Sequence, residues 1–345
     1  MNGRTVKAII ILLSVLAVSF AGIGVLKNRN TPPPEISGGT VFPDGGNGTG
    51  CQSIHDPTQV SDTPPPEISS ETVFPDGGND TECQPIHDPT QVFVYDVTDG
   101  VMKFRQGTDR KIVPASVTKL LTALTALDMM PENTVITPGD ELKLVAAGSS
   151  VAYIKAHHRL TLAMLVEGML LPSGNDAAYV TAAGAARYAT GNRDMSGRDA
   201  VDYFMAKVNE YAVKIGCTGT HFTVPDGLAY EGHYTTADDL VIIAEKALEN
   251  PVISRCTMLL SDRVKYASGH TNTWHNTNLL INPDSEYYRS SVTGLKTGSL
   301  TDAYSVLVSA VINGKTYIIG VFSARYPKDR YIIADRIIDG LSDKT

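Results

Sequence analysis

The chain has 345 residues, of which 37 are acidic and 29 are basic, so its formal charge at pH 7 is −8. This balance lacks the basic surface that nucleic-acid-binding proteins carry, so we expect no nucleic-acid partner. Four cysteines in a chain of this length are too few for a scaffold held together by disulfides.

An apolar run occupies most of the first thirty residues. No charged residue lies between residues 8 and 26, and basic residues flank the run on both sides. Nineteen such residues are enough to span a bilayer as a helix. The tripeptide Ser19-Phe20-Ala21 also fits the cleavage site of a secretory signal. A cleaved signal and a retained anchor are both open, and we favour the anchor at 1–30 because the run continues past that site.

Residues 31–92 consist of two near-copies with a period of 32 residues, which Cys51 and Cys83 mark. They hold ten acidic residues, no basic residue and many Pro and Gly, so we expect a disordered linker before a folded domain at 93–345. Each cysteine precedes a histidine by four positions, so Cys51, His55, Cys83 and His87 could together ligate zinc. A Cys51–Cys83 disulfide is also open, and a solvated tether is the favoured interpretation.

The folded domain opens with a predicted hairpin. Residues 93–97 and 101–106 have strand character, and Thr98-Asp99-Gly100 is typical of a turn. A helix is then predicted after Pro114, which has no amide hydrogen to lose and suits a first helical turn.

The helix after Pro114 carries the first chemical motif, Ser116-Val117-Thr118-Lys119. Residues three apart on a helix are neighbours, so the Lys119 amine can reach the Ser116 hydroxyl. A serine needs a base to become a nucleophile, and a lysine can serve only if burial or nearby positive charge lowers its pKa. In isolation the pair is more typical of an ordinary amphipathic helix.

The second motif is Ser173-Gly174-Asn175. Residues 161–171 are predicted to form a buried helix that Pro172 ends, and an alanine-rich helix follows from about Asp176. The motif therefore connects two helices and can point a hydroxyl and a carboxamide into a cleft. The same residue types are common in plain helix–helix turns.

The third motif, Lys296-Thr297-Gly298, ends a predicted strand over 292–298. Two more strands are predicted at 303–312 and 315–324, joined by an Asn-Gly turn, and a helix at 329–341 should pack on them. A lysine and a threonine on a strand can bind a carboxylate, and the glycine lets a substrate backbone approach. Taken alone, a lysine on an edge strand can equally serve to prevent aggregation.

Together these elements predict an α/β fold. An antiparallel sheet flanked by helices would join an all-helical lobe, with a cleft between them. The three motifs in this order describe a serine acyltransferase whose base is a lysine.

Residues 93–338 resemble the low-molecular-mass penicillin-binding proteins, and more narrowly the serine-type D-alanyl-D-alanine carboxypeptidases. The segments His221–Leu228 and Thr235–Leu240 also match the family pattern. The resemblance implies the architecture just described. It also implies that Ser116 is the acylated nucleophile, that Lys119 is its base, and that Ser173 relays a proton to the leaving D-alanine.

The resemblance further implies the substrate contacts. Asn175 would bind the substrate amide, and Lys296 and Thr297, beside Gly298, would hold the terminal carboxylate. The backbone N–H of Ser299 would share the oxyanion hole with that of the nucleophile. The chain departs from the family after this motif, where it has Asp302-Ala303-Tyr304-Ser305 instead of a small Ala-Gly pair, which leaves the cleft floor undefined.

The leading interpretation is a carboxypeptidase that removes the terminal D-alanine of peptidoglycan stem peptides ending in D-Ala-D-Ala and is inhibited by β-lactams. A D,D-endopeptidase would use the same motifs. A β-lactamase would need a deacylating glutamate, and the nearest candidate, Glu245-Lys246-Ala247-Leu248-Glu249, lacks the asparagine of the pattern. A non-catalytic penicillin-binding sensor is the fourth alternative.

No cofactor is expected, and no metal site. Six histidines outside the repeats show no metal-ligating spacing: His157, His158, His221, His233, His270 and His275. Cys217 and Cys256 are expected to be ordinary partly buried residues, with a bridge between them left open. Because peptidoglycan lies outside the cytoplasm, we expect a protein of the bacterial cell membrane with an extracytoplasmic catalytic domain, or a secreted one if the N-terminal segment is cleaved.

Overall fold

The computed structural model describes residues 90–228 and 231–343. The predictions for the N-terminal segment and for the repeats up to residue 89 lie outside these residues. Within the described ranges, no helix is both long enough and apolar enough to cross a membrane.

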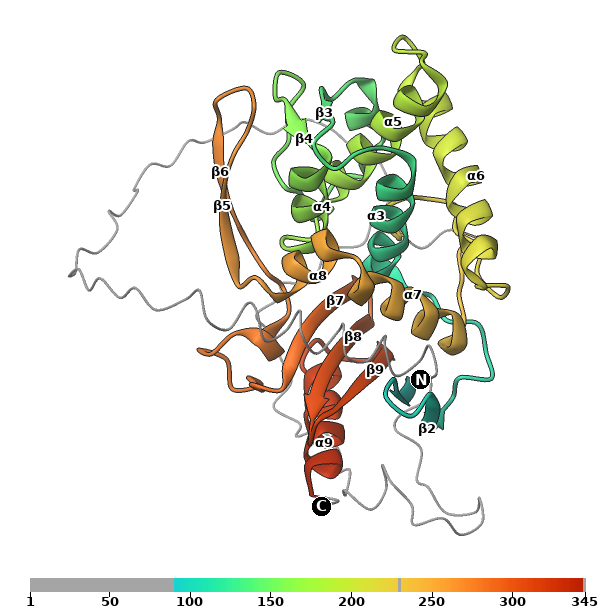
Figure 1. Ribbon diagram of the computed structural model, residues 1–345, viewed down its shortest axis with the longest axis vertical. Coiled ribbons are helices and arrows are strands. Elements are labelled where there is room, and N and C mark those ends of the chain that lie inside the picture. The colour runs from blue at the N-terminus through green and yellow to red at the C-terminus, as the bar shows by residue number, and fades with distance from the viewer. Residues whose placement is uncertain (1–89, 229–230, 344–345) are drawn as a thin grey trace, which may run out of the picture. The chain divides into compact units, whose positions relative to one another are not determined.

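A five-stranded antiparallel sheet forms the centre of the fold (Figure 1). Its strands follow in the order β2 (Val101–Gln106), β1 (Gln91–Asp96), β9 (Lys315–Ala324), β8 (Ala303–Ile312) and β7 (Val292–Leu300). All four pairings are antiparallel. The strands predicted from the sequence are therefore confirmed. The first begins at Gln91, two residues ahead of the expected start of the folded domain.

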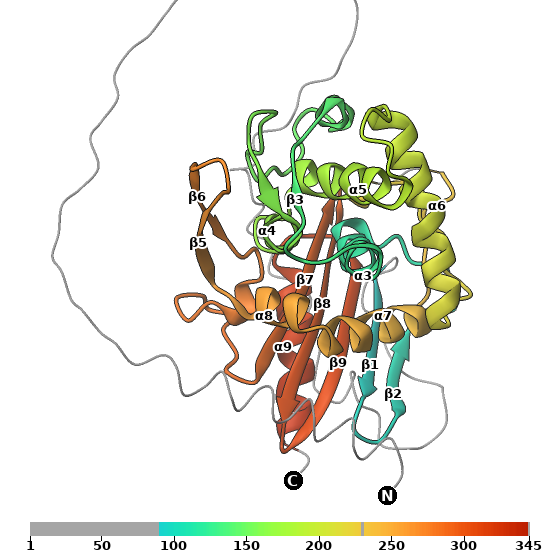
Figure 2. The ribbon, with the colours of Figure 1, turned by 45° about the horizontal axis from the view of Figure 1, so that its top comes forward.

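The two faces of the sheet bury different sets of side chains, because successive residues of a strand point to opposite faces. On β9, Ile318 belongs to the core beneath the helical lobe, and Ile319 belongs to the core beneath α9 (Asp329–Ser342). The face opposite α9 is covered by α7 (Ala237–Glu249) and α8 (Pro251–Met258), which cross the sheet in Figure 2. The predicted α/β architecture and the packing of the terminal helix are confirmed.

The helical lobe is built around α3, which is buried from Thr118 to Ala126. Three helices pack against α3 (Thr118–Met129) and against one another: α4 (Leu162–Leu170), α5 (Asn175–Thr190) and α6 (Gly197–Ile215). Two short pairings that the sequence did not predict lie beside them: β3 (Val135–Ile136) with β4 (Leu160–Thr161), and β5 (Ser261–Lys265) with β6 (Thr271–His275). Short 3-10 turns complete the fold: η1 (Ala115–Val117), η2 (Asp140–Leu144) and η3 (Leu279–Ile281).

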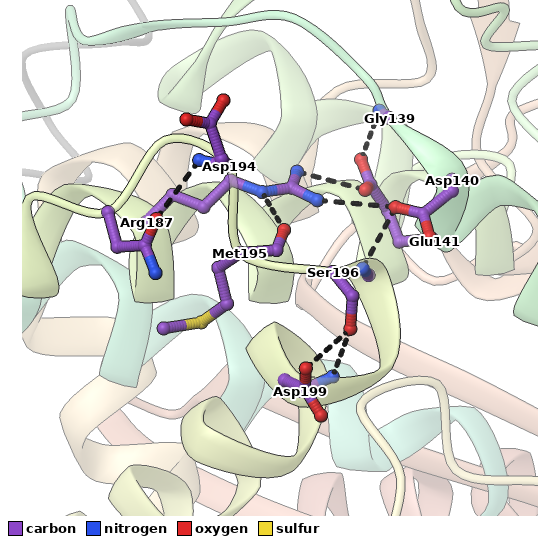
Figure 3. Close-up of polar contacts among 10 residues, drawn as sticks. Gly139, Asp140, Glu141, Arg187, Asp194, Met195, Ser196 and Asp199 are labelled. Atoms are coloured by element: carbon purple, nitrogen blue, oxygen red, sulfur yellow. Dashed lines mark hydrogen bonds and ion pairs between the residues drawn. The ribbon is translucent and has the colours of Figure 1, made fainter.

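A buried ion pair fastens η2 to the two longest helices of the lobe (Figure 3). Glu141 is fully buried and accepts a hydrogen bond from Arg187 Nη1 at 2.9 Å and another from the Gly139 amide at 2.6 Å. Arg187, on α5, also donates from Nε to the Met195 carbonyl at 3.1 Å. The buried carboxylate is thus paired with a cation and held by a backbone donor, which a buried charge requires.

Cys217 and Cys256 are both buried and free. Burial raises the pKa of each thiol to about 12. The two cysteines therefore do not bridge, and they behave as small apolar groups of the core.

Candidate active site

Ser116 lies in a tight turn rather than in the first turn of an α-helix. Residues Ala115–Val117 form η1, and α3 begins only at Thr118. The turn is strained, because Ala115 has a φ of 50°, a left-handed conformation that a residue with a side chain rarely adopts. The prediction of one continuous helix after Pro114 is wrong at this point, but the three-residue spacing still brings the serine and the lysine together.

Lys119 is fully buried and its amine meets three oxygen atoms. Its Nζ lies 2.8 Å from Ser116 Oγ, 2.8 Å from Asn175 Oδ1 and 2.8 Å from the Asp226 carbonyl oxygen. Burial lowers the pKa of Lys119 to about 8, while the negative charges of Asp226 and Asp176 act in the opposite direction. The amine therefore titrates close to neutral pH, which suits a general base.

The second motif bends sharply at the end of α4. Ser173 has a φ of 60°, and a Cβ atom on Gly174 would lie only 2.7 Å from both the Ala152 side chain and the Gly168 carbonyl oxygen. Only glycine fits at this position. The bend places Asn175 in the first turn of α5, where its side chain contacts Lys119. Ser173 is buried at the same bend, but its hydroxyl is not among the three partners of the Lys119 amine.

The loop that contains Asp226 packs directly on the turn that contains Ser116. A Cβ atom on Gly227, whose φ is 83°, would lie 1.8 Å from the Ala115 carbonyl oxygen, so the loop approaches this close only because it has a glycine there. His233 adds a second tie, since its Nε2 lies 2.9 Å from Thr118 Oγ1 and its Nδ1 accepts the Thr223 amide hydrogen at 3.0 Å. The sequence signal was the segment His221–Leu228, to which we assigned no role.

The third motif lies on β7, beside η1. Lys296 is almost fully buried, and its Nζ donates to the Thr297 carbonyl at 3.0 Å. Burial holds the pKa of Lys296 well below its ordinary value, and the positive charges of Lys119 and Arg330 lower it further. A Cβ atom on Gly298 would lie 2.9 Å from the Ala115 Cβ, so the strand fits against the turn only without a side chain.

Arg330 is a residue of this site that the sequence analysis missed. It extends from α9 to β7, where its Nη1 donates to the Gly298 carbonyl at 2.8 Å and to Ser299 Oγ at 3.0 Å. The guanidinium carbon also lies 5.8 Å from the centre of the Tyr304 ring. A buried arginine thus supports the strand segment that follows Lys296. No sequence motif indicates a role for Arg330, because it is 32 residues from Gly298 and resembles any polar residue of an amphipathic helix.

A cavity of about 600 Å³ lies next to Ser116 and Asn175. The first two motifs contribute to its lining through Ser116 and Asn175, and Ser299, the residue after the third motif, lines it as well. Asp302 and Tyr304, the residues at which the chain departs from the family pattern, also line it. The cleft wall beside the third motif is therefore formed by an acidic side chain and an aromatic ring in place of a small Ala-Gly pair.

Comparisons with known proteins identify the family of the chain. The profile of a family described as D-alanyl-D-alanine carboxypeptidase matches residues 79–325. The D-alanyl-D-alanine carboxypeptidase DacF of Bacillus subtilis is 27% identical over 245 residues, which make up 70% of this chain and 58% of that protein. The D-alanyl-D-alanine carboxypeptidase of Streptomyces sp. K15 is 31% identical over 234 residues, 65% of this chain and 77% of that protein. The chain thus spans less than two thirds of the Bacillus relative.

A solved structure shares the fold. The crystal structure of the Streptomyces K15 DD-transpeptidase superposes with a TM-score of 0.64 at 26% sequence identity, covering 72% of this chain and 95% of that one. The family profile extends over more than half of the chain and includes all three motifs of the cleft. On this evidence the chain belongs to the D-alanyl-D-alanine carboxypeptidase family of serine peptidases.

Proposed function

We propose that this protein removes the terminal D-alanine from peptidoglycan stem peptides that end in D-Ala-D-Ala, through an acyl-enzyme on Ser116. The observation that supports this most directly is the 2.8 Å hydrogen bond between Ser116 Oγ and a buried lysine amine whose pKa is about 8. A neutral amine at that distance can take the hydroxyl proton as the oxygen attacks.

The proposed acylation begins when Ser116 Oγ attacks the carbonyl carbon of the penultimate D-alanine and its proton passes to Lys119. The negative charge then develops on the carbonyl oxygen, which the backbone N–H groups of Ser116 and Ser299 would stabilise. When the C–N bond breaks, the leaving amine takes up a proton, which Ser173 would relay. Water then attacks the ester and releases the shortened peptide, so the enzyme returns to its starting state.

The substrate's free carboxylate would bind at the third motif. Lys296 and Thr297 lie on β7, and Arg330 on α9 adds a further positive charge next to Gly298. Three basic groups lie close together in this region, and the positive charges of Lys119 and Arg330 disfavour the protonated form of Lys296. An anion that enters the cleft relieves that repulsion, which favours substrates with a free terminal carboxylate.

Mass spectrometry of the products from a defined pentapeptide and from a cross-linked peptide dimer tests this function. Loss of one D-alanine from the pentapeptide supports a carboxypeptidase, and cleavage of the dimer alone would support an endopeptidase instead. A labelled penicillin should acylate the wild-type protein and leave Ser116→Ala unlabelled. Labelling of the alanine variant at the wild-type rate would remove Ser116 as the nucleophile.

Transpeptidation is a second candidate, because the K15 structure that superposes on this chain is of a DD-transpeptidase. In that reaction an amine, rather than water, attacks the acyl-enzyme. Adding a peptide amine to the pentapeptide assay separates the two outcomes: a new amide-linked product indicates transfer, and unchanged loss of D-alanine indicates hydrolysis.

We also propose that the protein acts outside the cytoplasm, attached to the bacterial cell membrane by residues 8–26. The uncharged run and its flanking basic residues support this, as does the location of peptidoglycan. Cell fractionation with intact-protein mass spectrometry tests it. A protein in the membrane fraction that retains its N-terminus supports the anchor, and a shortened protein in the medium would show that the segment is a cleaved signal.

A further inference from the structure

Three histidines from two distant parts of the chain meet on the surface of the helical lobe. His157 and His158 precede β4, and His270 lies at the tip of the β5–β6 hairpin, more than a hundred residues later. The ring centres are 4.6 Å apart for His157 and His158, 4.9 Å for His157 and His270, and 4.6 Å for His158 and His270. One ring nitrogen from each residue lies within 4.8 Å of those of the other two.

The cluster combines one fixed ring with two adjustable ones. His158 is buried, its Nδ1 accepts the Lys155 amide hydrogen at 3.1 Å, and its ring packs edge-on against Tyr266 at 4.9 Å. His157 and His270 are exposed. Zinc binds imidazole nitrogen at about 2.0–2.1 Å, so tetrahedral ligand atoms lie about 3.3 Å apart. Rotation of the two exposed rings can close the remaining gap.

We propose that His157, His158 and His270 form a binding site for a divalent transition-metal ion such as Zn²⁺, with water completing the coordination. Imidazole is a preferred ligand of zinc, copper and nickel. Three protein ligands leave a position open to solvent, and the site joins the loop at 155–159 to the hairpin tip.

Binding has identifiable costs. Coordination through either nitrogen of His158 requires the Lys155 hydrogen bond to be given up, because binding through Nε2 moves the ring proton to Nδ1, which then no longer accepts the amide hydrogen. Lys155 and Arg159 also bring positive charge to the same loop, but both are exposed, so solvent screens them. Burial, followed by the neighbouring His157 and His270, lowers the pKa of His158, which favours the neutral ring that a metal needs. The site should therefore be weaker than a closed four-ligand zinc site.

The position of the site connects it to the cleft wall. The hairpin is already attached to the segment before the cluster, since the Asn272 side chain and the Trp274 indole donate to the Ala152 carbonyl at 2.9 and 3.0 Å. The Asp176 carboxylate accepts the amide of Ala152, and the Asn175 amide donates to the Ser150 carbonyl. A metal that fixes the hairpin tip would therefore hold the same segment that lines the cavity at Ser150.

Isothermal titration calorimetry of the full-length protein with ZnCl₂ tests the proposal. All proteins carry Cys51→Ser and Cys83→Ser, because those thiols would also bind zinc. We expect one equivalent of zinc to bind. The double variant His157→Gln/His270→Gln should weaken that binding by at least about tenfold. Removing an outer-shell partner of a metal ligand already lowers metal affinity by about this factor, and removing the ligands themselves should lower it more. Both substituted residues are exposed, so folding should be preserved.

His275→Gln is the matched control, because His275 is exposed on β6 of the same hairpin and lies outside the cluster. It should bind zinc as the unsubstituted protein does. Footprinting with diethyl pyrocarbonate, with each modified residue assigned by fragmentation, gives a site-resolved reading: zinc should protect His157 and His270 but not His275. Equal isotherms for the double variant and the control, or equal modification with and without zinc, would overturn the proposal.

Discussion

Two buried lysines lie near Ser116, and their surroundings give them different chemistry. Lys119 has three oxygen partners and two nearby carboxylates, which limit the fall of its pKa to about 8. Lys296 donates to one carbonyl and has only cations among the charges that shift its pKa. The first is therefore suited to exchange a proton near neutral pH. An anion that binds beside the second should raise its pKa, because a carboxylate favours the charged amine.

The pH dependence of acylation should report the charge next to Lys119. The base must be neutral, so kcat/KM should rise with pH through a pKa of about 8. Asp226→Asn removes a negative charge that stabilises the protonated amine, so the pKa should fall and the rising limb should move to lower pH. Penicillin acylation rates measured across pH check this.

Asp302→Asn is the control for that shift, because Asp302 lines the same cavity but is not among the groups that shift the pKa of Lys119. Its pH profile should match the wild type. A limb that stays in place or moves to higher pH in Asp226→Asn would contradict the assignment of Lys119 as the titrating base.

Lys296 and Thr297 should recognise the terminal carboxylate of the substrate. A charge-assisted hydrogen bond is worth about 1.5–3 kcal/mol, so Lys296→Ala, or amidation of the terminal D-alanine, should lower kcat/KM about tenfold or more. The two changes remove the same contact and should be non-additive. Kinetics with both enzymes and both peptides complete the cycle. Fully additive losses would place the carboxylate elsewhere.

At the scale of elements, the helical lobe depends on the ion pair between η2 and α5. Glu141 has no solvent exposure, so its charge relies on Arg187 and on the Gly139 amide (Figure 3). The Gly197 amide, at the start of α6, donates to the Asp140 carboxylate beside it at 2.8 Å. One short turn thus holds the ends of two long helices together.

Arg187→Met should destabilise the protein by about 3–5 kcal/mol, because it leaves a buried carboxylate without its partner. Urea denaturation measures the change in the free energy of unfolding. Lys207→Met provides the control, since Lys207 forms an exposed ion pair with Glu210 on α6 and should have little effect. If the loss comes from the unpaired charge, adding Glu141→Met to Arg187→Met should recover much of the stability, and no recovery would refute that explanation.

At the scale of the whole molecule, the two repeats should be dispensable for the reaction. A variant that begins at residue 88 keeps Thr90 and Gln91, both buried, and all of β1. The acidic, proline-rich repeats have too few apolar residues to form a core, so this variant should fold and hydrolyse peptide like the full chain. Circular dichroism and kcat/KM measure the two properties. An unfolded or inactive product would mean that the repeats contribute to the domain.

The elements that sequence analysis predicted correctly depend on short-range patterns. The runs of mainly apolar residues along 303–312 and 315–324 predict strands, and the Asn-Gly turn predicts their hairpin. The spacing of Ser116 and Lys119 brings these two residues together on a helical turn. Arg330 was missed because its role depends on how α9 crosses the sheet, and the β5–β6 hairpin because its strands are short, polar and largely exposed.

Family membership, the order of the motifs and the main strands and helices could thus be inferred from the residues alone, because periodicity and motif spacing are properties of the chain itself. The state of Lys119 could not, because its pKa depends on complete burial and on partners 56 and 107 residues away. The His157–His158–His270 cluster and the contacts of Arg330 with β7 could not be predicted for the same reason. Each depends on contacts between distant segments, which exist only once the sheet and the helical lobe have packed together.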